Sequence, residues 1–180
     1  MNNQVPLGIL ANQFWHEAVA YLRAADTLIR DASAMDTIPP TYFMMSHSLE
    51  LMLKAYLLSR DVPYLEVFGL QHHILKAYEK AKSLGLVVDV EHAEAMTERL
   101  SDFHKVHLFR YPVVSKEDGS LLLRGTLVRP TEVLQIIEAI GTKISSSVMF
   151  ARLNAARHGD FPTETWHMGM PAGEDADASE

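Results

Sequence analysis

The segment from Pro40 to Arg60 constrains the fold more than any other part of the chain. Wound as a helix, it carries apolar side chains on two faces and leaves only a narrow polar stripe, which contains His47, Glu50 and Lys54. A helix that is apolar nearly all round is buried from more than one side. We therefore predict that this helix is the centre of a bundle, or that it carries a subunit interface as well as the core.

Helical periodicity recurs in four further segments, which prolines, glycines and short polar stretches separate from one another. The expected helices span about residues 11–31, 40–60, 71–83, 90–108 and 131–156. Pro39 and Pro40 separate the first two helices, Gly85 ends the third, and Pro112 ends the fourth. The predicted fold is all-α, an up-and-down helical bundle of about five helices.

Between Tyr111 and Val128 the apolar period changes to two, which is typical of extended chain. Asp118 and Gly119 stand between two such runs, and Asp-Gly favours a tight turn. We predict a short β-hairpin over about 111–128, inserted before the last helix. Beyond residue 160 the composition turns to Pro, Gly, Ala and acids, so we expect a domain over 8–160 and an acidic, flexible tail over 161–180.

The composition limits the classes of function. The 180 residues include no cysteine, which excludes disulfides, thiolate zinc sites and cysteine nucleophiles. The formal charge is −7 and Lys and Arg form no cluster, so we expect only weak or local contact with RNA. The first residues lack the pattern of a signal peptide, and charged residues or histidine interrupt every apolar run. We therefore expect a cytoplasmic protein with no membrane partner.

Two stretches resemble the HEPN family of helical bundles, namely SHSLELMLKAYLLSRDVP and HHILKAYEKAKSLGL. The family pattern places a serine, a glutamate and Lys-Ala on one helix, and a histidine before the next apolar helix. Here these positions are Ser46 or Ser48, Glu50, Lys54 with Ala55, and His72 or His73. The later stretch FHKVHLFRYP resembles members whose fourth helix ends in an Arg-Tyr-Pro turn. In helical layout the resemblance covers about residues 10–155.

This resemblance implies one of two activities. Many HEPN proteins are metal-independent endoribonucleases of the toxin or defence type, with an Arg-x(4–6)-His motif and a dimeric active site. Others lack the motif and serve as binding or regulatory modules. The partners that the resemblance implies are a second copy of the chain and a protein of the nucleotidyltransferase or antitoxin type.

Arg99 and His104 form an Arg-x4-His pair near the place where the family motif is expected. The arginine would hold a phosphate, and the histidine would act as general acid or base toward a ribose 2′-hydroxyl. Five steps along a straight helix separate the two side chains by about 140°, so they need a kink or a second chain to converge. Between them, the apolar Leu100 stands where many active members have a polar residue.

The sequence contains two other candidate Arg–His pairs. His107 with Arg110 is a second version of the ribonuclease hypothesis. Arg152 and His158 have five residues between them, but a basic pair at the end of the last helix is better explained by the negative end of the helix dipole.

A polar cluster between the second and fourth helices is the other candidate site. It forms if the side of the fourth helix that carries His104 and His107 faces the polar stripe of the second helix. The predicted ligand-binding residues are His47, Glu50, Lys54, His107, Arg110 and Tyr111. Such a cluster suits a phosphate-bearing or carboxylate ligand, and it equally suits a satisfied structural network. His104-x-x-His107 with Glu50 has metal-ligand spacing, but the Glu-x-x-His repeats of helical di-metal proteins are missing, so we predict no metal and no cofactor.

The sequence thus predicts a HEPN-like binding or regulatory module that is non-catalytic and forms a homodimer. The alternative is a metal-independent endoribonuclease that uses Arg99 with His104, or His107 with Arg110. The acidic charge, the apolar residue at position 100 and the lack of a basic face favour the first. A subunit that partners a nucleotidyltransferase encoded as another chain would leave the same traces in the sequence.

Overall fold

The computed structural model describes residues 4–31, 37–105, 128–158 and 163–165. Within these ranges the chain forms six helices and one pair of short strands, which confirms the predicted all-α bundle. The helices are α1 (Leu7–Arg30), α2 (Ile38–Ser59), α3 (Tyr64–Gly69), α4 (Ile74–Ser83), α5 (Ala93–Lys105) and α6 (Pro130–His158). The strands are β1 (Gln4–Pro6) and β2 (Thr163–Thr165). The hairpin predicted over 111–128 lies outside the described residues, apart from Val128.

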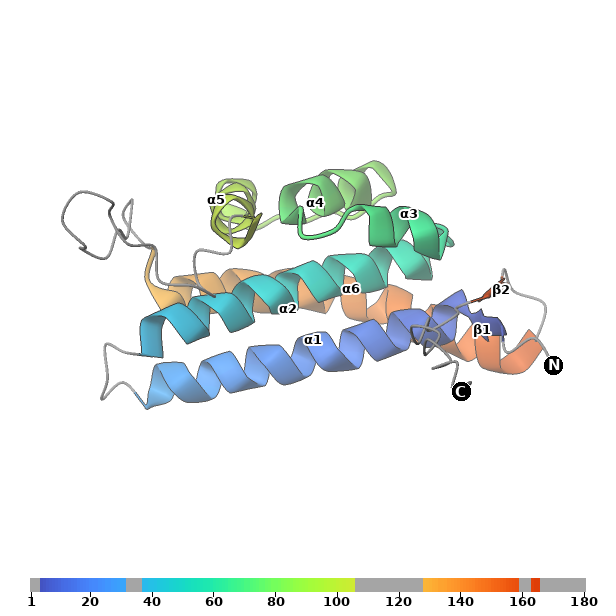
Figure 1. The fold of residues 1–180 in the computed structure, drawn as a ribbon, viewed down its shortest axis with the longest axis horizontal. Coiled ribbons are helices and arrows are strands. Elements are labelled where there is room, and N and C mark those ends of the chain that lie inside the picture. Colours follow the sequence, from blue (N-terminus) through green and yellow to red (C-terminus); the bar gives the residue numbers. More distant parts are fainter. Residues whose placement is uncertain (1–3, 32–36, 106–127, 159–162, 166–180) are drawn as a thin grey trace, which may run out of the picture.

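The helix α2 is the centre of the bundle. It packs against α1 and α6 on one side and against α4 and α5 on the other, and the three long helices lie side by side (Figure 1). Every residue from Ser48 to Leu58 is buried. Of the two predictions for this helix, the central position is therefore confirmed, and the core of a single chain accounts for its apolar excess.

Small side chains let α1 approach its neighbours closely. Ala11, Ala18 and Ala25, each seven residues from the next, are fully buried along one seam. At the start of α1, a Cβ atom added to Gly8 would lie 2.3 Å from the carbonyl oxygen of Ala151 in α6. Only glycine fits this contact, so the backbones of α1 and α6 nearly touch at this end of the bundle.

The shorter helices α3, α4 and α5 cover α2 on the side away from α1 (Figure 1). In that view α5 is seen nearly end-on, so it crosses the long helices. The helix α4 ends before Gly85, as predicted, and this glycine adopts a φ of +93°. The helix α3 was not predicted: the segment 61–69 was expected to be a connection, yet it winds into six helical residues that bury Tyr64 and Val67.

The two strands pair in antiparallel fashion, with Gln4 opposite Thr165 and Pro6 opposite Thr163. They lie at the same end of the bundle (Figure 1). The strand β2 falls inside the segment 161–180, for which the sequence predicted a flexible tail. The pairing thus ties a piece of that segment to the residues that precede α1.

The part of α6 from Pro130 to Arg157 is long and apolar enough to cross a membrane, judged by length and composition alone. The core helix of a bundle passes the same test, and α6 packs against both α1 and α2. Its inward face carries the spacing that the sequence predicted. The buried residues of that face are Val133, Ile137, Ile140, Ile144 and Val148.

Candidate functional site

Three polar side chains of α2 lie at helical steps on the side that α4 and α5 cover: His47, Glu50 and Lys54. Glu50 is only 2% exposed and Lys54 only 8% exposed. Charged side chains are almost never buried to this degree unless they are paired. The lysine Nζ donates a hydrogen bond of 2.6 Å to Glu50 Oε1, so the two full charges neutralise each other.

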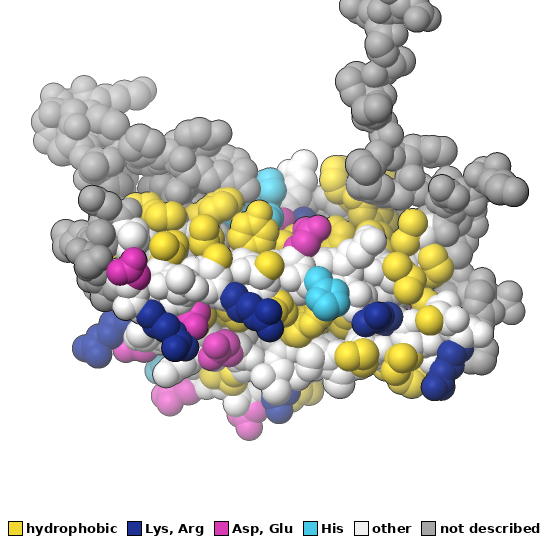
Figure 2. All heavy atoms as spheres, turned by 90° about the horizontal axis from the view of Figure 1, so that it is seen from below, with side chains coloured by type: hydrophobic (Ala, Val, Ile, Leu, Met, Phe, Trp, Pro, Cys, Tyr) yellow, Lys and Arg dark blue, Asp and Glu magenta, His cyan; other side chains and the backbone are white. Residues whose placement is uncertain are grey.

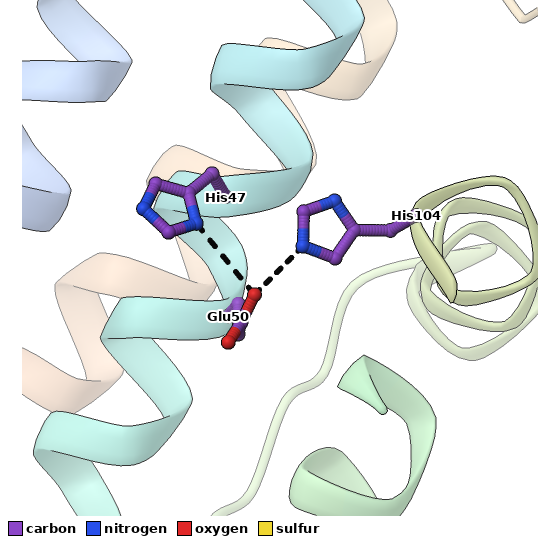
Figure 3. A group of neighbouring side chains, drawn as sticks. All are labelled: His47, Glu50 and His104. Carbon is purple, nitrogen blue, oxygen red and sulfur yellow. Dashed lines mark hydrogen bonds and ion pairs between the residues drawn. The ribbon is translucent and has the colours of Figure 1, made fainter. Parts of the chain in front are cut away.

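The other carboxylate oxygen of Glu50 is surrounded by imidazole rings. Oε2 lies 2.7 Å from His104 Nε2, 3.2 Å from His72 Nδ1 and 3.6 Å from His47 Nδ1 (Figure 3 draws His47 and His104). The rings come from α5, from the turn before α4 and from α2 itself. We call these five residues, Glu50, Lys54, His47, His72 and His104, the Glu50 cluster.

Glu50 is ionised in the folded protein. Burial opposes its charge and on its own would raise its pKa. The hydrogen bond from His104, the contact with His47 and the charge of Lys54 outweigh that effect and hold the pKa well below its usual range. The buried carboxylate is therefore an acceptor for every group that points at it.

For His104, unlike Glu50, burial is the effect that prevails, and it favours the uncharged form. Desolvation lowers the pKa of this imidazole, and it prevails over the hydrogen bond and the charge of Glu50, which favour the protonated ring. The ring is thus kept neutral. Because an ionised carboxylate can only accept, the single ring proton lies on Nε2, facing Glu50, and Nδ1 keeps its lone pair.

The ring of His47 lies in an aromatic setting. Tyr21 meets it edge-on with ring centroids 4.6 Å apart, and Phe43 stacks on it at 5.8 Å. Its Nδ1 atom is buried and, within the described part of the chain, has no hydrogen-bond partner. At 3.6 Å the contact with Glu50 Oε2 is too long for a hydrogen bond. One nitrogen of the Glu50 cluster is therefore left unsatisfied.

The structure gathers some of the predicted site residues and places others apart. His47, Glu50 and Lys54, predicted to bind a ligand, lie together, and His104, predicted to be catalytic, joins them. The remaining predicted ligand-binding residues, His107, Arg110 and Tyr111, lie outside the described residues. His72 was named from the sequence only as one of two candidates for the histidine of the HEPN pattern, and not as a site residue. Its place just before a new helix was the one signal that could have assigned it to the site.

Arg99 lies away from the Glu50 cluster. It is exposed and lines a groove of about 910 Å³ between α5 and α6, together with Met96, Phe103 and Ile136. His104 instead points at α2, and Leu100 between them is buried in the core. Within one chain the two residues of the Arg-x4-His pair therefore face different surroundings. The groove is also lined by acidic residues: Glu91, Glu98, Asp102 and Glu132.

The basic side chains of the described residues can be seen on one face of the molecule in Figure 2. On the face that Figure 2 shows, Lys and Arg side chains are scattered among acidic and apolar ones. A phosphate backbone binds most strongly to clustered basic side chains. The weak or local contact with RNA that the composition predicts stays a prediction.

The donor atoms of the Glu50 cluster also have the composition of a metal site. His47, Glu50 and His104 each place one ligand atom within 4.8 Å of the other two. The same atoms suit a neutral polar ligand, or a network that only joins the helices. Comparison with known proteins does not choose among these: the chain matches no family model, no curated protein and no solved structure at a significant level.

Proposed function

We propose that this chain is a cytoplasmic, non-catalytic, HEPN-like binding or regulatory module whose ligand site is the Glu50 cluster. One observation carries the proposal: Glu50 Oε2, buried at the centre of a bundle, is approached by imidazoles from three separate elements. Burying charges costs several kcal/mol per ion, and apolar residues of similar volume often hold helices as well. Buried groups with strongly shifted pKa values cluster at functional sites.

The cluster is reachable from solvent at one edge. The His72 side chain is 42% exposed and the His47 side chain is 19% exposed, whereas Glu50 and His104 lie behind them. His72 is therefore the member of the cluster that solvent reaches most readily. A ligand bound at the cluster would thus be held by buried groups on one side and by a partly exposed ring on the other.

A metal-independent endoribonuclease remains the alternative. It would need Arg99 from a second copy to meet His104, because the two face apart within one chain. It would also need His104 to leave its place behind Glu50, since its side chain is only 2% exposed. Both requirements favour the non-catalytic proposal.

The homodimer that we propose would use α6. Among the described residues, α2 carries no large apolar side chain that is exposed, because the core buries them. On α6, in contrast, Met149, Phe150 and Leu153 are large apolar side chains that are exposed. The same surface would suit a protein partner of the nucleotidyltransferase or antitoxin type. We expect dimers in sedimentation equilibrium and a shift to monomers in Phe150→Ser. The matched control is Leu65→Ser, which removes an equally exposed apolar side chain from α3.

The catalytic alternative is tested with labelled, structured RNA in EDTA. We expect the RNA to stay intact at high concentrations of wild-type protein. The same reaction is run with Arg99→Ala, His104→Ala and His107→Ala, each checked for a wild-type melting curve. Cleavage by the wild type that one of these folded variants loses would replace our proposal with a ribonuclease.

Ligand binding is tested by native mass spectrometry of the protein purified from cytoplasm. We expect a mass above the 20.2 kDa of the chain that is present in the wild type and missing from Glu50→Leu/Lys54→Met. This double variant replaces the buried charges with apolar side chains of similar size, so it should keep the fold. A bare chain in both samples would count against the proposed ligand site.

A further inference from the structure

We infer that the Glu50 cluster binds one divalent first-row transition metal ion through His47 Nδ1, His104 Nε2 and Glu50 Oε2, with His72 as a fourth ligand at the solvent edge. The inference rests on the proposed function, because it names the ligand of the same site. It differs from the prediction of no metal made from the spacing of His104-x-x-His107 with Glu50, because His47 and His72 now supply ring nitrogens.

The first argument is that Glu50 Oε2 has more neighbours than it can bind. A carboxylate oxygen offers about two lone-pair positions, and Oε1 is already taken by Lys54. His104 and His72 fill the positions on Oε2, so His47 Nδ1 stays buried without a hydrogen-bond partner among the described residues. A cation between these atoms would give every one of them a partner.

The second argument is the support behind the carboxylate. A metal ligand is typically oriented by a further hydrogen bond from a neighbouring group. Lys54 does this for Glu50: its bond to Oε1 fixes the carboxylate so that Oε2 points at the three rings. Lys54 also offsets the charge of Glu50 when no ion is bound, which makes the empty site tolerable inside the bundle.

The third argument is the chemistry of the donors. Three imidazole nitrogens and one carboxylate oxygen, without a thiolate, suit Zn²⁺, Co²⁺ or Ni²⁺ better than Mg²⁺ or Ca²⁺, which prefer oxygen. An imidazole binds a metal ion through a ring nitrogen that carries no proton. His72 is partly exposed, so its position can alternate between the ring and a water molecule.

The distances require only side-chain movement. A tetrahedral ion with bonds of about 2.0–2.2 Å holds its ligand atoms roughly 3.3–3.6 Å apart. His47 Nδ1 already lies 3.6 Å from Glu50 Oε2. His104 Nε2 lies at 2.7 Å and has to retreat by less than about 1 Å, while the ring changes tautomer: it releases the proton on Nε2 and takes one up on Nδ1, so that the neutral ring offers its Nε2 lone pair to the ion. The rings of His47 and His104 are 6.1 Å apart at their centroids, so their backbones can stay in place.

The experiment uses metal-free full-length protein, titrated with Co²⁺ and followed by its visible ligand-field bands. We expect bands of tetrahedral intensity that saturate at one ion per chain, and Zn²⁺ should displace the Co²⁺. The ligand variants are His47→Asn, His104→Gln and Glu50→Gln, which keep a polar atom near the original nitrogen or oxygen. Each should bind at least about 100-fold more weakly, more than the loss of a supporting residue usually costs.

Matched controls separate the site from other histidines. His92→Asn changes an exposed histidine in a backbone conformation that asparagine tolerates, and it should bind like the wild type. Lys54→Met should weaken binding by about 10-fold, the effect of losing a supporting residue. Unchanged affinity in His104→Gln and Glu50→Gln, or equal loss in His92→Asn, would overturn the inference.

Two further measurements keep the test decisive. If a ligand variant fails to fold, the wild type is titrated with Zn²⁺ while the nitrogen resonances of its histidine rings are recorded. Shifts at His47 and His104 with none at His92 support the site, and the reverse refutes it. An organic adduct in the native mass spectrum, with no metal bound, would refute the metal site and would still agree with the proposed ligand-binding function. A chain that carries no adduct and also binds no metal would refute both the metal site and the proposed ligand-binding function.

Discussion

The two sides of α2 are held by different physical means. Toward α1 and α6 the contacts are close and mostly apolar. Met52 lies beside Gly141 of α6, and the small Ser48 donates a hydrogen bond from Oγ to the backbone oxygen of Ala18. Toward α4 and α5, buried apolar residues such as Ile74 and Leu100 also pack in the core, but charged and imidazole groups meet beside them at Glu50 and Lys54. The first side depends on shape, so it should tolerate changes of pH but not of volume. The second depends on ionisation as well, so it should also respond to changes of pH.

The largest effect should come from removing the carboxylate alone. Glu50→Leu leaves Lys54 buried without its partner, and breaking a buried pair in this way costs about 3–5 kcal/mol of the free energy of unfolding. Glu50→Leu/Lys54→Met should recover most of that loss, because no buried charge is then left unpaired. Urea denaturation of the three proteins measures both. A double variant as unstable as the single one would show that the polar side is needed for stability.

On the apolar side, two glycines of different surroundings form a matched pair. In Gly8→Ala the new methyl group would meet the backbone of Ala151, which cannot move aside, so we expect a loss of about 1–3 kcal/mol. In Gly141→Ala the methyl group would lie 3.2 Å from the sulfur of Met52, at the flexible end of a side chain. That variant should lose less than about 1 kcal/mol. Thermal melts compare them, and equal losses would mean that α1 and α6 can separate at Gly8.

The pH dependence should come from the polar side. The pKa values of His104 and Glu50 are lowered by folding, so the unfolded chain binds protons more readily than the folded chain. The stability they contribute is present above the unfolded values, about 6.5 for histidine and 4.3 for glutamate, and is lost as pH falls. Among the described residues, the other titratable groups that face them are His47, His72 and Lys54.

We therefore expect the free energy of unfolding of metal-free protein to fall as pH drops below about 6.5, by at most about 1.4 kcal/mol per pH unit for one proton. Urea midpoints measured at successive pH values give the slope. His104→Gln should flatten it, whereas Gly8→Ala should shift the whole curve without changing its slope. An unchanged slope in His104→Gln would assign the proton to another group.

The smallest effect should come from Arg99→Ala. The side chain is exposed at the groove between α5 and α6 and belongs to neither side of α2, so the change should alter stability by less than about 0.5 kcal/mol. It should also leave Co²⁺ binding unchanged. Loss of the cobalt bands in this variant would show that the groove and the Glu50 cluster are linked.

The long helices could be predicted from the sequence because their apolar residues recur at helical spacing and Pro or Gly stands between them. The helix α3 could not, since its six residues are too few for a periodic signal. The pairing of β1 with β2 joins distant three-residue segments whose sequences carry no alternation. Local pattern therefore predicts elements, and it misses pairings that only the folded chain creates.

The candidate site divides in the same way. His47, Glu50 and Lys54 were predicted because all three lie on one helix, where spacing alone fixes their common side. The convergence of His72 and His104 on the same oxygen depends on how α5 crosses α2 and on the turn at Gln71, whose φ is +49°. No single-helix pattern contains that information. The opposed directions of Arg99 and His104, by contrast, follow from the angle per residue of a helix.

The placement of the Glu50 cluster also has a kinetic consequence. Glu50 and His104 are 54 positions apart in the chain, so their bond closes only after α5 has docked on α2. Contacts at such separation tend to form late, after the local helical contacts that set the folding rate. Loosening the cluster should then accelerate unfolding and hardly slow folding, and an ion bound there should lengthen the lifetime of the native state.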